Sequence, residues 1–385
     1  MKVVNVGINL IPSRGGIYNT VTSFARAFKE LDYGGRVLNC GRSTESHSEF
    51  GSSWTFIKTS PLPVLRQYFF WHGFWTGAAQ EVIGAPDLVF IHGLFYHTAA
   101  AAAAYCRRRG IPYILVSHGS LDPVVFTYRW IRKEAWTRIY RKRLLVESSA
   151  VVFSTRTEAE KAAKWTSGSK VRIIPWPVEH IPDYDKYRAR AMLLEKYDLP
   201  RQTRVAIFCG RLDPIKRPLE TIRHFKATAG SDWALLLVGP PTDRLPVAAV
   251  EAACREPGPR SIWVGPAYGQ NLIDHFRAAE LFILLSAKEN FSHATAEALA
   301  LGVPVFLSRG VDLWRDLAPA DCSFVAPDDQ SGPLRAALAR VLSSDPDELG
   351  AAGKRGRDWV RKELSAERFA QRLGELCEAV ASTGG

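Results

Sequence analysis

A chain of 385 residues exceeds what one ordinary hydrophobic core supports and predicts two domains, while its 46% hydrophobic content excludes a disordered protein. Six cysteines scattered without a CxxC pair argue against a disulfide framework or a zinc site and predict a protein of the reducing cytoplasm. The net charge of +11 lies in residues 1–180, which hold 23 Lys and Arg against 12 Asp and Glu. A half so charged attracts anions, namely nucleic acid, acidic lipid headgroups or phosphorylated substrates.

The opening stretch MKVVNVGINLIPSRGG predicts a β-strand at residues 3–8 and no signal peptide, because the apolar run is short and ends at Pro12. Gly15 and Gly16 follow this strand and precede a predicted helix at residues 18–31. Two adjacent glycines let the backbone approach a phosphate closely and offer N–H donors, although a tight turn is the commoner reason for such a pair.

The uncharged run LVFIHGLFYHTAAAAAAYC at residues 88–106 has the length of a membrane span, but two histidines and a glycine interrupt it. We therefore expect a strand at 88–92 and an Ala-rich helix ending at 107–109. The next predicted strand, YILVS, runs directly into HGSLDP. This places His118 at a strand's carboxyl end, where either a catalytic or a structural role suits it.

Residues 128–145, YRWIRKEAWTRIYRKRLL, contain seven basic residues and one acid. A helix here gathers an apolar stripe flanked by the basic residues, and the stripe consists of Ile131, Ala135, Trp136, Ile139, Tyr140 and Leu145. Two explanations stay open. Either the stripe packs into the first domain, or the surface from Arg129 to Arg143 lies on an anionic membrane, to which the aromatic cluster at 62–75 in the same domain would add.

Short β-branched runs alternate with helical segments along both halves, which is typical of parallel sheets covered by helices. The expected strands are 3–8, 36–39, 88–92, 113–117, 150–154, 205–209, 234–238, 262–264, 281–285 and 303–307. A Pro-rich stretch at 175–200 is the expected linker. The fold class predicted is α/β, with two Rossmann-like domains at 1–178 and 179–363. A last segment, 364–385, contains a helix at 366–381 that is able to pack back across the domain junction.

Two charged motifs follow strands in the second half, where α/β sheets bind their ligands. After VAIFC comes GRLDPIKRP, in which Arg211 and Lys216 suit a diphosphate as a planar fork and a point charge. A solvated basic loop explains this motif equally well.

After LFILL comes SAKENFSHATAEALALGVPV, with Glu289 in a loop and a helix predicted to begin at the N-cap Ser292. A phosphate suits the N-terminus of that helix. Glu297 lies about 7 Å further along the helix, within reach of a ribose of the same nucleotide. The alternative is that Glu289 only stabilises the helix terminus and that Glu297 pairs with a nearby Lys or Arg.

The order RGG, HGSLDP, GRLDPIKRP and E-x7-E followed by ALALGVPV resembles retaining glycosyltransferases of the large GT-B family 4. That family includes sucrose and glycogen synthases and many bacterial polysaccharide and lipid-linked sugar transferases. The resemblance covers nearly the whole chain. It implies two domains facing across a cleft, the first for the acceptor and the second for a UDP- or GDP-linked sugar donor, with retention of anomeric configuration and neither metal nor other cofactor.

The resemblance also implies roles for individual residues. Gly15 and Gly16 would lie near the diphosphate, which Arg211 and Lys216 would hold; His118 and Glu289 would lie at the donor sugar, and Glu297 at the ribose. Asn290, Phe291 and Ser292 stand where the family often has Gly-Phe-Gly beside the donor. This departure leaves the identity of the sugar open.

The sequence predicts a cytoplasmic glycosyltransferase, peripheral on the inner face of the plasma membrane if its acceptor is a lipid-linked saccharide of bacterial surface polysaccharide synthesis. Two alternatives remain at this point, a GT-B sugar-nucleotide epimerase and a nucleic-acid-binding protein. The first lacks a convincing acid–base pair beyond His118, and the second lacks a zinc finger, an aromatic RNA-binding strand or a basic tail. The DYD at residues 183–185 matches a metal-binding DxD pattern, but its place in the predicted linker favours a chance match.

Overall fold

The computed structural model spans the whole chain and describes residues 1–8, 10, 16–41, 54–58, 84–95, 97–127, 130–179, 186–327 and 331–382. The chain divides into two compact units. Unit 1 comprises Met1–Pro177 together with Ala366–Gly385, and unit 2 comprises Val178–Ser365. The C-terminal segment is therefore part of the first unit.

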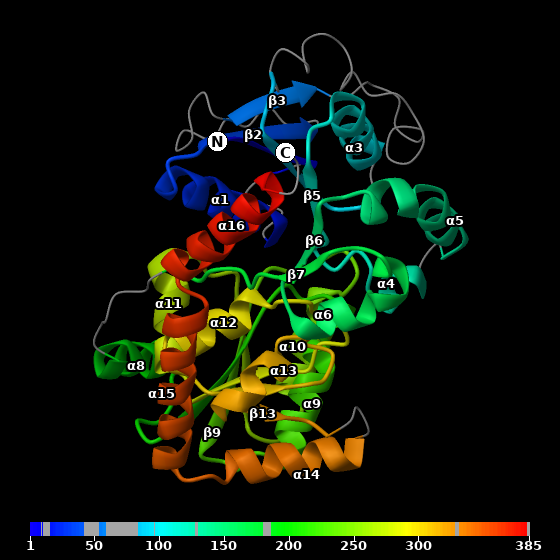
Figure 1. Ribbon diagram of the computed structural model, residues 1–385. Coiled ribbons are helices and arrows are strands. Elements are labelled where there is room, and N and C mark those ends of the chain that lie inside the picture. The colour runs from blue at the N-terminus through cyan, green and yellow to red at the C-terminus, as the bar shows by residue number, and fades with distance from the viewer. Residues whose placement is uncertain are drawn as a thin grey trace. The chain divides into compact units, whose positions relative to one another are not determined.

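Unit 1 is built on a seven-stranded sheet in the order β3-β2-β1-β4-β5-β6-β7, in which every pair of neighbours is parallel (Figure 1). Its strands are β1 (Lys2–Ile8), β2 (Gly34–Gly41), β3 (Trp54–Lys58), β4 (Leu88–His92), β5 (Tyr113–Val116), β6 (Ala150–Phe153) and β7 (Val171–Ile173).

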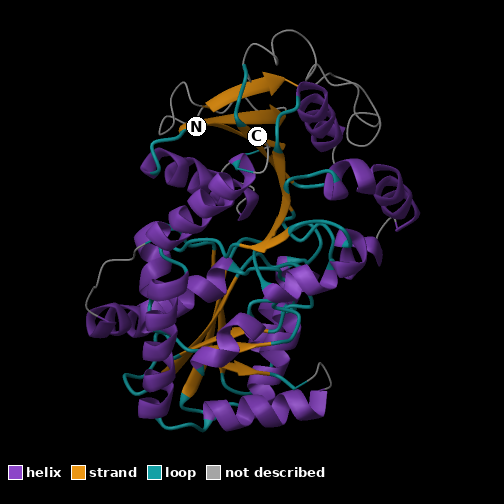
Figure 2. Cartoon of the chain, viewed as in Figure 1, coloured by secondary structure: helices purple, strands orange, loops and turns teal. Residues whose placement is uncertain are grey.

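Unit 2 contains a six-stranded parallel sheet in the order β10-β9-β8-β11-β12-β13. Its strands are β8 (Arg204–Cys209), β9 (Trp233–Val238), β10 (Arg260–Gly265), β11 (Leu281–Leu284), β12 (Val305–Leu307) and β13 (Ser323–Val325). Helices cover both sheets (Figure 2). The predicted α/β class with two doubly wound parallel sheets is confirmed.

The helices of unit 1 include one that comes from the far end of the chain. They are α1 (Gly16–Glu30), α3 (His97–Arg109), α4 (Pro123–Thr127), α5 (Trp130–Arg141), a π-helical turn (Lys142–Val146), α6 (Arg156–Lys161), α7 (Ala163–Thr166) and α16 (Ala366–Ala381). The last of these lies against the first, since the rings of Phe24 and Phe369 meet edge to face at 5.2 Å.

Unit 2 has helices on both sides of its sheet. They are α8 (Lys186–Lys196), a 3₁₀ turn (Pro214–Lys216), α9 (Pro218–Thr228), α10 (Val247–Arg255), α11 (Gly269–Ala278), α12 (His293–Ala300), α13 (Trp314–Leu317), a second 3₁₀ turn (Ala318–Ala320), α14 (Ser331–Leu342) and α15 (Pro346–Glu363).

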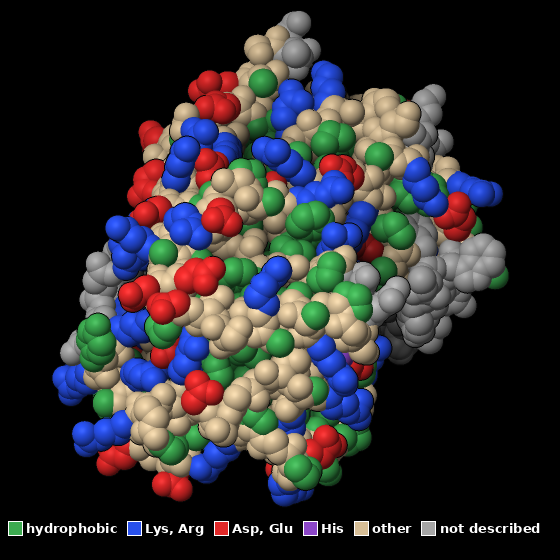
Figure 3. Space-filling view, turned by 90° about the horizontal axis from the view of Figure 1, so that it is seen from below, with side chains coloured by type: hydrophobic (Ala, Val, Ile, Leu, Met, Phe, Trp, Pro, Cys, Tyr) green, Lys and Arg blue, Asp and Glu red, His purple; other side chains and the backbone are tan. Residues whose placement is uncertain are grey.

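The long uncharged run of the first half forms two elements, β4 and α3, as the interrupting His and Gly residues predict. Across the residues that the structure describes, no helix has the length and apolar character needed to span a bilayer. On the face drawn in Figure 3, Lys and Arg side chains are interspersed with Asp and Glu, so this face has no patch of a single sign.

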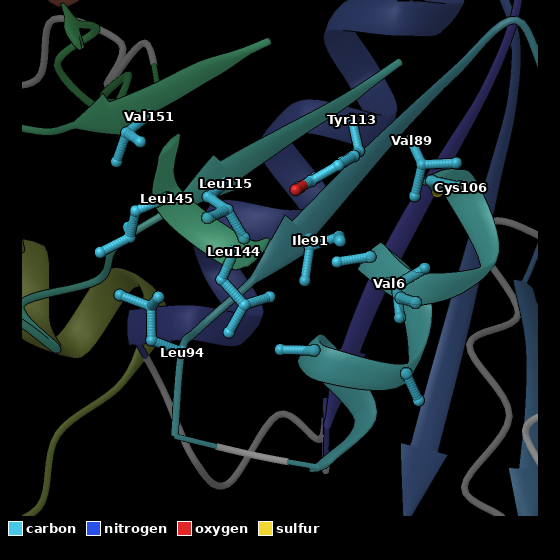
Figure 4. Packing of buried hydrophobic residues seen from close by; sticks show 14 of the residues in the cluster. Val6, Val89, Ile91, Leu94, Cys106, Tyr113, Leu115, Leu144, Leu145 and Val151 are labelled. Carbon is cyan, nitrogen blue, oxygen red and sulfur yellow. The ribbon is translucent and has the colours of Figure 1, made fainter. Parts of the chain in front are cut away.

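The core of unit 1 is made by side chains of the central strands and of the helices above them. Val6, Ile91 and Leu115 from neighbouring strands lie close to Cys106 of α3 and Leu144 of the π-helical turn (Figure 4). All residues of β4, β5 and β6 are buried, as are all six of β9. Continuous burial explains the uninterrupted apolar runs from which these strands are predicted.

Candidate active site

The loop after β8 carries the first pair of candidate cations. Gly210 has φ +155°, and a Cβ added there would lie 2.8 Å from Cδ of Lys216, so glycine lets the lysine side chain pass over the strand end. The buried Asp213 accepts a hydrogen bond from the N–H of Ile215 at 3.0 Å and thereby fixes the 3₁₀ turn that ends at Lys216.

The two cations are in different electrostatic states. Arg211 is exposed, and within the described ranges its guanidinium has no hydrogen bond or ion pair. Lys216 forms an ion pair with Glu289, and the side chains of this pair are only 14% and 19% exposed. The structure therefore brings together two candidates that lie on different loops, while Arg211 presents its charge to solvent.

Glu289 is held by the backbone of the loop that follows β12. Its N–H donates to the carbonyl of Gly310 at 2.7 Å, and its own carbonyl accepts from the N–H of Asp312 at 2.8 Å. A Cβ on Gly310 would lie 2.2 Å from the carbonyl oxygen of Ser286, so only glycine permits this close approach. The backbone position of Glu289 is fixed independently of its ion pair.

Ser292 is the N-cap of α12, as predicted. Its hydroxyl accepts from the N–H of Thr295 at 3.4 Å and shares a hydrogen bond with the Thr295 hydroxyl at 2.8 Å. Its φ of +59° lies in the left-handed region. Serine adopts this conformation at a cost in free energy, whereas glycine adopts it without that cost. Phe291 is buried and Asn290 is half-buried. The side chains of Phe291 and Ser292 thus have packing and capping roles within unit 2.

Glu297 lies on α12, half-buried. Among the described residues its carboxylate has no hydrogen bond or ion pair, and its electrostatic neighbours are the acids Glu179 and Cys209. Burial, with a smaller contribution from Glu179, raises the pKa of Glu297 above its ordinary value. The alternative in which a Lys or Arg neutralises this carboxylate is not found in the part of the chain that the structure describes.

His293, the first residue of α12, was not among the sequence candidates. Its ring meets that of Phe291 at 5.2 Å. Burial, and then the charge of Lys216, lowers the pKa of His293 to about 4, so this imidazole is neutral at physiological pH. A histidine inside the E-x7-E pattern is the signal in the sequence that marks it.

In unit 1, Gly16 is the first residue of α1, whereas Gly15 lies outside the described residues. Within the described structure, a Cβ added at Gly16 meets nothing within 4 Å. Packing of unit 1 alone therefore does not require glycine at this position.

His118 lies in the loop after β5 and has a left-handed backbone, with φ +50°. The buried Glu158 holds this loop, since its Oε1 accepts from the N–H of Gly119 at 2.6 Å and its Oε2 accepts from the N–H and hydroxyl of Ser154 at 2.8 and 2.7 Å. Further along, Asp122 pairs with Lys161 at 3.1 Å. The carboxylate of Glu158 thus ties the N–H of Gly119, next to His118, to Ser154 at the end of β6, and supports the left-handed backbone of His118.

The structure adds His92 to the candidates, because Nδ1 of His92 lies 2.9 Å from Nε2 of His118. His92 is the last residue of β4 and thus stands at the carboxyl edge of the sheet. The sequence LVFIH could have marked His92 as a candidate, because a histidine that ends a buried strand lies at the same edge of the sheet as His118.

The apolar stripe expected on α5 is divided, and the expectation of one continuous stripe is wrong. Trp136 is buried and holds the helix on unit 1, whereas Ile131 and Ile139 are each 64% exposed. Leu145 is buried because the chain passes into a π-helical turn at Lys142, which changes the helical register. The DYD at 183–185 lies outside the described residues, and within the described residues no three His, Cys, Asp or Glu side chains are grouped to hold a metal ion.

Parallel α/β sheets with charged groups on the loops after their strands are typical of doubly wound proteins that bind nucleotides. The sequence family described as Glycosyltransferase Family 4 matches residues 14–180, and the one described as Glycosyl transferases group 1 matches residues 190–359. The chain belongs to glycosyltransferase family 4.

Relatives of known name agree with this membership. The chain is 27% identical to TuaC of Bacillus subtilis (strain 168), named as a teichuronic acid biosynthesis glycosyltransferase, over 57% of this chain and 52% of that protein. It is 24% identical to the GDP-mannose:cellobiosyl-diphosphopolyprenol alpha-mannosyltransferase of Xanthomonas campestris, over 80% and 78%. The match thus spans about half the length of the first relative.

Among solved structures, the fold is similar to that of Anabaena Alr3699/HepE in complex with UDP and glucose. The TM-score is 0.75 at 14% identity, and the match covers 98% of this chain and 100% of that one.

Proposed function

We propose that this protein is a retaining, metal-independent glycosyltransferase that moves a sugar from a UDP- or GDP-linked donor to a lipid-linked saccharide. Family membership supports the reaction class, and the UDP bound by HepE supports a nucleotide-sugar donor. The polyprenol-linked acceptor in the name of the Xanthomonas relative supports the acceptor class.

The observation that carries the proposal is the unpaired carboxylate of Glu297. A half-buried carboxylate without a cationic partner is stabilised by neutral hydrogen-bond donors, which replace the water that burial removes. The two adjacent hydroxyls of a ribose supply two such donors to the two carboxylate oxygens. Glu297 therefore binds the nucleotide through its pentose.

The two cations of the loop after β8 suit the rest of the nucleotide. Arg211 offers an exposed planar fork, and Lys216 a point charge that a diphosphate draws away from Glu289. Charge that develops on the departing diphosphate is stabilised by these preorganised cations. Glu289 and His118 act at the donor sugar, and Gly16 permits close approach of a phosphate to the first turn of α1.

A panel of UDP-, GDP-, ADP- and dTDP-sugars tests this function by thermal shift in buffer with EDTA, followed by a transfer assay on any hit. The expected result is stabilisation by one nucleotide class and a product whose anomeric signal in NMR matches that of the donor. A protein that is stabilised by none of them but binds heparin or DNA would refute the proposal.

The exposed face of α5 supports the lipid-linked acceptor. Ile131, Ala135 and Ile139 lie four residues apart and so share one face of the helix, and all three are exposed. Arg138, whose side chain is 74% exposed, adjoins this face. Apolar side chains beside cations suit the headgroup region of an anionic leaflet, where each isoleucine contributes about 1–2 kcal/mol and each cation about 1 kcal/mol.

Vesicle flotation tests this docking. Wild-type protein is expected to float with phosphatidylglycerol vesicles and not with phosphatidylcholine vesicles, and the Ile131→Ser/Ile139→Ser variant is expected to lose at least tenfold in binding. The matched control is Met192→Ser, which removes an exposed apolar side chain of α8 in unit 2. Equal flotation of all three proteins would refute docking through α5.

A further inference from the structure

Two histidines come together at the carboxyl edge of the sheet in unit 1. In the parallel pair β4–β5, His92 lies opposite Val116, and His118 follows two residues later. The Nδ1 atom of His92 is 2.9 Å from Nε2 of His118, with ring centroids 5.2 Å apart. A single hydrogen bond joins the imidazoles, and one of them must donate it.

A third residue decides the direction of that hydrogen bond. The Nε2 atom of His92 lies 3.0 Å from Oδ1 of Asn5, a fully buried residue of β1. With the Asn5 amide oriented in this way, its oxygen faces His92 and only accepts, so Nε2 of His92 carries the hydrogen. A neutral imidazole has one N–H, which leaves Nδ1 of His92 as an acceptor and makes Nε2–H of His118 the donor.

The surroundings keep His92 neutral and both rings fixed. Burial, and then the neighbouring His118, lowers the pKa of His92 well below its ordinary value. The ring of Phe24 meets His92 edge-on at 5.1 Å, and Trp176 lies 5.6 Å from the ring of His118. Both aromatic side chains are buried.

We propose that His92 and Asn5 are positioning residues that hold His118 as the Nε2–H tautomer, with the lone pair of the imidazole on Nδ1. In this form, Nδ1 of His118 accepts a hydrogen bond from a sugar hydroxyl during transfer. The inference rests on the proposed role of His118 at the donor sugar and adds which nitrogen acts and what fixes it.

The tautomers are read directly by long-range ¹H–¹⁵N NMR of the full-length protein labelled at histidine. The expected spectrum shows both His92 and His118 protonated at Nε2. Protonation of both at Nδ1 would mean that the amide group of Asn5 donates instead, and this result would overturn the inference without any activity measurement.

Kinetics give the second test. His92→Phe keeps a ring and removes both hydrogen bonds, so His118 loses its fixed tautomer; kcat is expected to fall about 10- to 100-fold with little change in KM for the donor. The matched control is His275→Phe, which removes a buried histidine of unit 2 that also has a partner at each nitrogen. If His92→Phe does not fold, His92→Leu tests the same loss with a smaller apolar side chain that makes no hydrogen bond.

The outcomes separate the two proposals. Full activity of His118→Ala would refute the role of His118 at the sugar. A strong loss in His118→Ala together with full activity of His92→Phe would leave that role intact and overturn the role of His92 alone.

Discussion

Glutamine in place of Glu297 keeps the shape of the side chain and removes its charge. Glu297→Gln therefore separates what the carboxylate costs in folding stability from what it contributes to nucleotide binding. Burial and the neighbouring Glu179 raise the pKa of this carboxyl, which means that the native state binds its proton more tightly than the unfolded state. The resulting stability is complete below the unfolded pKa, about 4.3, and is lost as pH rises through the folded pKa. At neutral pH the ionised carboxylate therefore destabilises unit 2 more than a glutamine does.

The size of the effect follows from the burial of Glu297 and its lack of a partner. An ionised carboxylate buried without a partner costs more than a neutral amide in the same position, and for a half-buried side chain we expect a difference of about 1 kcal/mol. In a domain of this size that gain raises Tm by about 2–4 °C. Charge-assisted hydrogen bonds to a ribose contribute roughly 1.5–3 kcal/mol each, so nucleotide affinity should fall at least tenfold per bond.

Differential scanning calorimetry between pH 5 and 8 and isothermal titration with nucleotide measure both effects. The difference in Tm between wild type and Glu297→Gln should shrink on acidification, because a protonated glutamate is as neutral as glutamine. Glu195→Gln, on the exposed side of α8, is the control for removing a carboxylate from unit 2. A lower Tm for Glu297→Gln, or an unchanged nucleotide affinity, would refute the reasoning.

Two further positions probe the backbone around the site. Ser292→Ala removes the N-cap hydroxyl and keeps the left-handed φ, at a cost of about 1 kcal/mol. Ser292→Gly also loses the cap, but glycine relieves the backbone and so offsets the loss. The urea midpoint of the glycine variant should therefore exceed that of the alanine variant, and the reverse order would contradict this account. Gly310→Ala drives a Cβ into the carbonyl of Ser286 and should cost more than about 2 kcal/mol. Gly332→Ala, in α14 with open space around the added Cβ, should be neutral or stabilising by the same measurement.

The strands that the sequence predicts and those that it does not predict differ in their place in the sheet. Every expected strand has its counterpart in the structure, whereas β3, β7 and β13 were not expected. All three are edge strands. An edge strand has one neighbour and less covering, so two of the three residues of β7 are exposed and β13 is three half-buried residues long. Such strands have no continuous apolar run to mark them.

Signals within a few residues predict parts of the site well, whereas contacts between residues distant in sequence are not predicted. Ser292 as N-cap and the helix at 366–381 follow from residues within one or two turns, and both are confirmed. The pairing of Lys216 with Glu289 joins residues 73 positions apart, and that of His92 with Asn5 joins residues 87 apart. Each residue stands after or within its own strand, and only the order of the strands in the sheet brings the partners together.

The two glutamates of the E-x7-E pattern are in opposite electrostatic states, because Glu289 has a cation as its partner and Glu297 has none in the described part of the chain. A nucleotide diphosphate that takes Lys216 must therefore leave Glu289 without its partner. Lys216→Ala removes an attraction for the diphosphate. It also leaves the half-buried carboxylate of Glu289 uncompensated, which is costly in itself, and this negative charge repels the diphosphate.

A double-mutant cycle separates these two effects. The Lys216→Ala/Glu289→Gln variant should bind bare UDP or GDP more tightly than Lys216→Ala alone, with a coupling of about 1–3 kcal/mol by isothermal titration. Glu289→Gln by itself releases Lys216 for the diphosphate, so it should keep or improve nucleotide affinity while turnover falls. Additive effects of the two substitutions would mean that the ion pair does not compete with the nucleotide. Equal losses of binding and turnover in Glu289→Gln would place Glu289 at the diphosphate instead of at the sugar.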